Sequence, residues 1–158
     1  MSTNGIEKIH NVWPLIVGEF FNHEHILIKD ELINFFKEYE KKLPEGNEQL
    51  RDKNYVGNYD LYQSKYNLLA ENENNKILKE VFKFIAKSIL TMSKKANAEE
   101  LENLKNNNPK FNVKINESWF IRYNKAGFIL PHMHGSCSWC CVYYVQIGKD
   151  ASKKNGST

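Results

Sequence analysis

The sequence predicts an α+β fold in which helices come first and a β-domain follows. Apolar residues recur every three or four positions in residues 30–43 and 77–90, which is the period of an α-helix with one buried face. After Pro109 the period changes to two, as in a β-strand. The chain has 158 residues, of which 41% are hydrophobic and 26% charged, so it is long enough to bury the core of a single domain, residues 1–158.

A short strand is expected near the N-terminus, and the first helix follows it. Residues 12–17 are apolar and partly β-branched, and Pro14 favours an edge or a bend. Asp30 can cap the helix, and Pro44 ends it. The apolar stripe of this helix consists of Leu32, Ile33, Phe36, Tyr39 and Leu43.

A second amphipathic helix is predicted in residues 77–90. The stretch 61–66 before it fits either a strand or irregular structure, and residues 96–105 either extend the helix or form a short separate one. Residues 1–108 are therefore expected to be mainly helical. The apolar stripe of the second helix is Ile77, Leu78, Val81, Phe82, Ile85, Ile89 and Leu90, with Lys79, Lys83 and Lys87 facing water.

The β part of the chain is expected in residues 109–158. Residues 111–116 and 118–123 have the period of two that predicts strands, and Gly127 marks a turn after them. Residues 139–145 are apolar on both faces, which predicts a strand buried on both sides. These residues are the first strands of a β-domain.

Composition argues against several classes of partner. The net charge is +3, but only two of the 22 basic residues are Arg, Arg51 and Arg122, so we expect no nucleic-acid binding. No apolar run is long enough to span a bilayer, and the first eight residues lack the apolar segment of a signal peptide. The three cysteines are clustered within residues 137–141, which favours reduced thiols. We therefore expect a soluble, cytoplasmic protein.

The pentad Pro131-His132-Met133-His134-Gly135 is the strongest candidate for chemistry. In an extended chain, residues two apart point to the same side, so His132 and His134 can present two imidazoles to one metal ion. Imidazole suits Fe, Zn, Cu and Ni alike, so the pair does not select the metal. Two histidines in a surface turn would have the same spacing. His23 and His25 also have it, and we expect them to be exposed side chains near the start of a helix.

Three segments together resemble a family of bacterial and phage 2-oxoglutarate/Fe(II)-dependent oxygenases related to the prolyl hydroxylases. They are residues 117–127 (Glu-Ser-Trp-Phe-Ile-Arg-Tyr-Asn-Lys-Ala-Gly), 131–134 (Pro-His-Met-His) and 142–145 (Val-Tyr-Tyr-Val). The family shows a Ser-Trp strand, a turn with Gly, a Pro-His-x-His motif and a Val-Tyr-Tyr-Val strand. The similarity covers about residues 116–148.

The resemblance implies N-terminal helices packed on a double-stranded β-helix, a jelly roll of the cupin-like kind. It implies that Fe(II) is bound by His132 and by His134, the latter at a position where relatives carry Asp or Glu. Tyr123 and Tyr144 are expected to hydrogen-bond the cosubstrate 2-oxoglutarate, and Trp119 is assigned to packing. The implied reaction uses O₂ and couples decarboxylation of 2-oxoglutarate to hydroxylation of a substrate that the sequence does not identify.

The sequence also departs from the family. Such enzymes take a distal His and an Arg that clamps 2-oxoglutarate from later strands, and no His follows His134 and no Arg follows Arg122. We therefore expect a C-terminally truncated copy that lacks the second half of the jelly roll and does not catalyse as it stands.

Two other functions fit the same residues. His132, His134, Cys137 and Cys140 offer four ligands within nine positions, which suits a small zinc-binding domain. A non-enzymatic β-domain that binds a partner through its tyrosine-rich strands is the other alternative. An incomplete barrel would leave open sheet edges, so self-association is also expected.

Overall fold

The structure is a computed structural model. The residues it describes are 6–12, 15–47, 58–104, 110–132, 134–135 and 137–149.

The chain begins with a β-hairpin. Strands β1 (Ile6–Val12) and β2 (Leu15–Phe20) pair antiparallel, so the predicted strand at residues 12–17 is divided between the two arms of the hairpin. Strand β2 also contacts the long helix α3 (Lys76–Ala96). A Cβ atom on Gly18 would collide with the sulfur of Met92, so glycine is what allows the hairpin to approach α3 this closely.

Helix α1 (His25–Lys42) starts earlier than the sequence predicts. Asp30 is an exposed residue inside the helix, so its assignment as the N-cap was wrong. The backbone carbonyl of Asn22 accepts from the amide of His25 at 3.0 Å, and its side-chain oxygen accepts from the amide of Glu24 at 3.1 Å. Ile26 and Leu27, in the added first turn, are exposed, so this turn lacks the apolar pattern that marks the rest of the helix.

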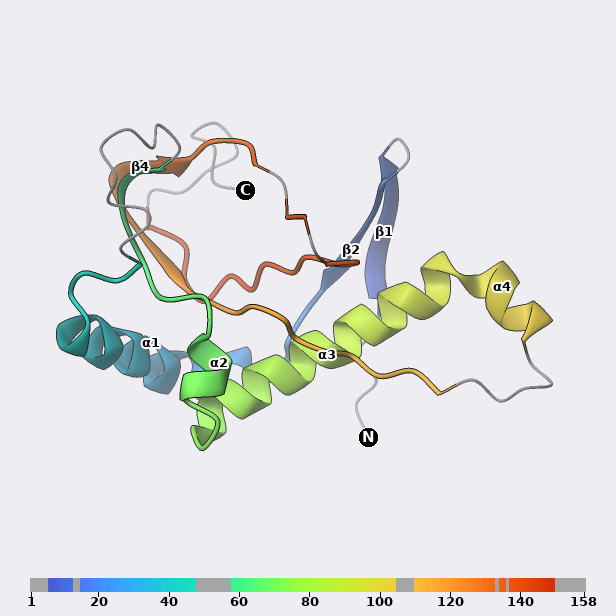
Figure 1. The fold of residues 1–158 in the computed structure, drawn as a ribbon, viewed down its shortest axis with the longest axis horizontal. Helices are drawn as coiled ribbons and strands as arrows, with labels where there is room; N and C mark the ends of the chain where they lie inside the picture. The colour runs from blue at the N-terminus through green and yellow to red at the C-terminus, as the bar shows by residue number, and fades with distance from the viewer. Residues whose placement is uncertain are drawn as a thin grey trace.

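Helix α3 has the buried face that its periodicity predicts. Leu78 and Val81 are buried, the other five residues of the predicted stripe are partly buried, and the three lysines on the opposite side are exposed. Asn75 caps the helix, because its side-chain oxygen accepts from the amide of Leu78 at 2.9 Å. Beyond α3, helix α4 (Ala98–Asn103) is a separate short helix and not an extension. Figure 1 shows α3 as the longest element, with α1 near one end and α4 at the other.

A second antiparallel pair links the middle of the chain to its C-terminal part. Strand β3 (Asn58–Gln63) pairs with β4 (Ile121–Ile129), with an irregularity at Asp60, which has a positive φ of 46°. The pairing continues to the fully buried Ser64. Its amide donates to the carbonyl of Phe120, and its hydroxyl accepts from the Phe120 amide, both at 3.0 Å. The short helix α2 (Leu68–Glu71) follows β3.

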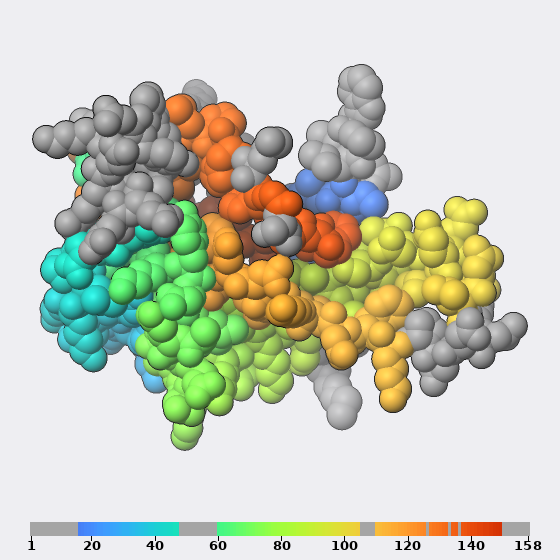
Figure 2. Space-filling view, viewed as in Figure 1, coloured from blue at the N-terminus to red at the C-terminus, as the bar shows by residue number. Residues whose placement is uncertain are grey.

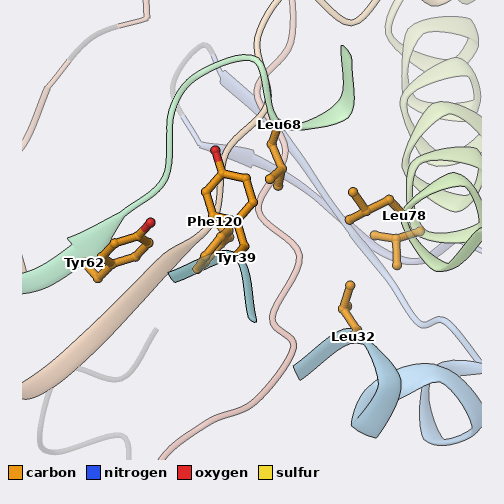
Figure 3. Packing of buried hydrophobic residues seen from close by; sticks show 7 residues of the cluster. Leu32, Tyr39, Tyr62, Leu68, Leu78 and Phe120 are labelled. Carbon is orange, nitrogen blue, oxygen red and sulfur yellow. The ribbon is translucent and has the colours of Figure 1, made fainter. Parts of the chain in front are cut away.

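The hydrophobic core lies where α1, α3 and the β3–β4 region meet. Phe120 occupies its centre, stacked on Phe36 with ring centroids 4.2 Å apart and packed against Tyr39 and Tyr62 (Figure 3). Helices α1 and α3 contact each other, and Leu32 of α1 and Leu78 of α3, which are 0% and 1% exposed, belong to the same buried cluster. The buried members of the cluster are Leu32, Tyr39, Tyr62, Leu68, Leu78, Val81 and Phe120.

The C-terminal part contains less sheet than predicted. Residues 110–120 are in neither a helix nor a strand, apart from a parallel bridge between Ser118 and Asn67. The strand predicted at residues 139–145 does not form either, and Val142 and Tyr144 are 71% and 51% exposed. Only one side of this segment is covered: Tyr143 and Val145 pack against the core, so the prediction of burial on both sides was wrong.

The described residues are therefore α+β, as predicted, with two separate two-stranded antiparallel sheets. In this part of the chain no helix combines the length and apolarity needed to cross a membrane.

Candidate functional site

The imidazoles of His132 and His134 lie side by side, as their spacing predicts. They follow directly after the end of β4, and their Nε2 atoms are 3.1 Å apart. Their ring centroids are 4.8 Å apart at an interplanar angle of 66°. Both side chains are exposed. The described residues between 110 and 149, orange to red in Figure 2, cross the middle of the face shown.

The ring of His132 is held by its own backbone. Its Nδ1 atom lies 2.9 Å from the carbonyl oxygen of Leu130. A carbonyl only accepts, so Nδ1 carries the proton and donates it, and in the neutral imidazole Nε2 is left with a free lone pair. Metal-ligating histidines commonly have this arrangement, in which one nitrogen donates to a carbonyl and the other faces the metal.

The ring of His134 is held by an aromatic neighbour. Trp119 stacks on it with ring centroids 5.6 Å apart and an interplanar angle of 26°. Tyr66 meets Trp119 edge to face at 5.1 Å. Trp119 was assigned to packing from the sequence; in the structure it packs against the second histidine of the pair and limits the rotation of that ring.

The two imidazoles do not by themselves make a complete metal site. Among the residues that the structure describes, no group of three or more His, Cys, Asp or Glu side chains is placed to hold a metal ion. The pair therefore fits Fe(II) as part of a ligand set and leaves the third ligand unassigned. The four-ligand zinc site expected from His132, His134, Cys137 and Cys140 is not assembled, because the cysteine pair does not join the histidine pair in one cluster.

The two tyrosines predicted to bind 2-oxoglutarate are close to each other. Tyr123 and Tyr144 are each 51% exposed. Burial raises the pKa of Tyr123, and the nearby Tyr144 raises it further. A phenol hydroxyl can donate a hydrogen bond to a carboxylate.

Arg122 is bound to an acidic residue within the fold. Its Nε donates to one carboxylate oxygen of Glu40 at 2.9 Å, and its Nη2 donates to the other. The Glu40 carboxylate also raises the pKa of Arg122. This arginine therefore joins β4 to α1.

One contact was missed by the sequence analysis. His23 and His25 were both expected to be exposed. His23 is exposed, but His25 is half-buried, so the prediction was wrong for His25. The hydroxyl of Tyr143 lies 2.8 Å from His25 Nδ1 and accepts from the side-chain amide of Asn22 at 3.0 Å. Phe84 of α3 meets the Tyr143 ring edge to face. No local sequence signal connects residues so far apart along the chain.

Comparison of the chain with protein-family models, with curated proteins and with solved structures finds no match.

Proposed function

We propose that this chain carries part of the Fe(II) and 2-oxoglutarate site of a prolyl-hydroxylase-like dioxygenase, with His132 and His134 as two of the metal ligands and without the distal His and the Arg of that family. The observation that carries the proposal is the geometry of the imidazole pair. The Nε2 atoms are 3.1 Å apart, and the Nδ1 proton of His132 is donated to a backbone carbonyl. The proposal includes the jelly roll that the resemblance of residues 116–148 implies.

The separation of the two nitrogens suits a shared ion. A histidine nitrogen lies about 2.0–2.1 Å from a bound zinc ion, and two such nitrogens at 90–110° around one ion are about 2.8–3.4 Å apart. The 3.1 Å separation of the two Nε2 atoms falls in this range. The pair would therefore need little rearrangement to bind a divalent transition metal ion, which reduces the conformational entropy lost on binding.

Metal binding requires one proton to move. The neutral form of His132 has a lone pair on Nε2, which can accept a hydrogen bond from Nε2–H of His134 across the 3.1 Å contact. For both nitrogens to face an ion, His134 must carry its proton on Nδ1. The affinity should also fall in acid, because a protonated imidazole cannot bind a metal.

The other predicted residues have chemistry that suits the proposed cosubstrate. When bound, Fe(II) with 2-oxoglutarate would supply the O₂-dependent chemistry that hydroxylates the substrate. The neutral imidazoles of His132 and His134 would hold the ion, and the phenols of Tyr123 and Tyr144 would donate hydrogen bonds to a carboxylate of 2-oxoglutarate.

Anaerobic titration with Fe(II), with and without 2-oxoglutarate, tests the proposal. We expect one ion per chain, tighter binding when 2-oxoglutarate is present, and the visible charge-transfer absorption of an Fe(II)–2-oxoglutarate chelate. His132→Ala and His134→Ala should each weaken binding by at least tenfold, because two ligands act together. The matched control is His23→Ala, which removes an exposed histidine from the other pair with the same spacing.

Three outcomes would contradict the proposal. If the double variant of His132 and His134 binds Fe(II) as the unmodified chain does, the imidazole pair is not the site. If 2-oxoglutarate changes neither affinity nor absorption, a metal site of another class is present. If zinc binds at one ion per chain and Cys137→Ser and Cys140→Ser abolish it, the chain is a zinc-binding domain.

A further inference from the structure

A second reactive pair lies in the segment that follows the histidines. The sulfur atoms of Cys137 and Cys140 are 3.3 Å apart, and both side chains are exposed. The two cysteines are separated by Ser138 and Trp139, so they form a Cys-x-x-Cys motif. Residues 137–149 contain no helix or strand. Two thiols are thus in contact in a part of the backbone that regular hydrogen bonding does not hold.

We propose that Cys137 and Cys140 form a reversible thiol–disulfide site that reacts with small disulfides. A disulfide has an S–S length of about 2.05 Å, so closing the bond moves the two sulfurs together by about 1.2 Å from their present separation. No helical or sheet hydrogen bonds need to break for this movement. This inference is independent of metal binding, because neither sulfur belongs to the imidazole pair.

The exchange with a small disulfide, written R–S–S–R, balances in two steps. The thiolate of Cys137 attacks one sulfur of R–S–S–R, which forms a mixed disulfide with the protein and releases one thiolate RS⁻. The thiolate of Cys140 then attacks the Cys137 sulfur, forms the Cys137–Cys140 bond and releases the second RS⁻. The two thiol protons go to the two RS⁻ ions, so the protein dithiol is oxidised and R–S–S–R is reduced to two thiols.

The order of attack follows from the surroundings of the sulfurs. Burial of its sulfur and then the hydrogen bond with Cys137 raise the pKa of Cys140 to about 11. Since only the thiolate is a nucleophile, the raised pKa makes Cys140 react slowly at neutral pH, and the first attack is assigned to its exposed partner Cys137. The reaction should therefore become faster as the pH rises.

The third cysteine is the internal control. Cys141 is exposed and free, next to Cys140 in the chain, and the structure pairs Cys140 with Cys137 and not with Cys141. Oxidation should therefore remove two of the three thiols and leave Cys141 able to react with an alkylating reagent.

The full-length reduced chain, with a chelator present, would be equilibrated in glutathione buffers of increasing oxidised fraction. Acid quenching, alkylation and intact mass measurement would then count the free thiols. We expect two thiols to disappear together at the mass of a single chain, and peptide mapping to locate the bond at Cys137–Cys140. Cys141→Ser should give the same midpoint within twofold. Cys137→Ser and Cys140→Ser should stop at a mixed disulfide with glutathione.

The same titration in guanidinium separates the effect of the fold from that of the motif. If the folded chain holds the sulfurs together, it should be oxidised at a concentration of oxidised glutathione at least fivefold lower than the unfolded chain requires. Equal midpoints for the folded and unfolded chains would overturn the proposal. A bond that includes Cys141, or one that joins two chains, would overturn it as well.

Discussion

The hydroxyl of Tyr143 lies 2.8 Å from Nδ1 of His25, although 118 positions separate the two residues in the sequence. Asn22 donates to the same hydroxyl at 3.0 Å, so the Tyr143 hydroxyl links Asn22 and His25. This contact holds residues 139–145 against the start of α1.

Replacing Tyr143 with Phe removes both hydrogen bonds and leaves the polar groups of Asn22 and His25 half-buried. We expect the free energy of unfolding to fall by about 1–2 kcal/mol, measured by urea denaturation. Tyr123→Phe is the matched control: its hydroxyl is on a side chain that is 51% exposed, and the loss should stay below about 0.5 kcal/mol. Equal losses in the two variants would show that the His25–Tyr143 contact does not stabilise the fold.

Replacing Trp119 with Leu should weaken metal binding at the proposed site. The indole restrains the ring of His134, so without it the ring must be ordered when the metal binds, at a cost of about 0.5–1.5 kcal/mol. This corresponds to a loss of roughly two- to tenfold in affinity for Co(II), which calorimetry would measure. Trp119→Phe keeps an aromatic face and should recover most of the affinity. Trp139→Leu, the control, should change it less than twofold; a larger effect there would argue against a specific role for Trp119.

Replacing Arg122 with Gln breaks the ion pair between β4 and α1. Both partners are partly exposed, so solvent screens the pair, and we expect a loss of about 0.5–1 kcal/mol at low salt that shrinks in 1 M NaCl. Lys41→Gln breaks the pair of Lys41 with Glu38, where the side chains are 70% and 59% exposed, and should change stability by about 0.3 kcal/mol or less. A loss for Arg122→Gln that is independent of salt would instead indicate packing of the arginine stem.

Replacing Leu32 with Ala creates a cavity where α1 meets α3. Leu32 is 0% exposed, so we expect a loss of about 2–5 kcal/mol in thermal or chemical unfolding. Leu27→Ala makes the same chemical change on the same helix at a side chain that is 79% exposed, and should cost less than about 0.5 kcal/mol. Similar costs at the two positions would mean that α1 packs through a different face.

Alkaline pH should destabilise the fold through Tyr62. Burial, followed by the nearby Tyr39 and Glu40, raises the pKa of Tyr62 to about 12. A free tyrosine has a pKa near 10, so folding favours the protonated phenol. Its contribution to stability is complete below about pH 10 and is lost as the pH rises toward 12. Urea midpoints measured between pH 9 and pH 11.5 should fall less steeply in Tyr62→Phe than in the unmodified chain; parallel curves would exclude this role.

Local periodicity predicted the two long helices and the pairing of the histidines. A period of 3.6 identifies the buried face of α3 from its own residues, since the geometry of a helix depends on near neighbours. The contact between His132 and His134 is local in the same way: two residues apart in an extended chain are on one side. The start of α1 was missed, because Ile26 and Leu27 are apolar yet exposed.

The amino-acid sequence alone thus determined the two long helices, the buried face of each, and that two imidazoles meet after β4. Only the tertiary structure decided which segments become strands. Residues 121–129 pair with β3 and residues 139–145 pair with no strand, although both have suitable composition. A strand takes its hydrogen bonds from a partner far away in the chain, so its local pattern cannot name that partner. The same reason explains why His25–Tyr143 and Glu40–Arg122 became visible only in three dimensions.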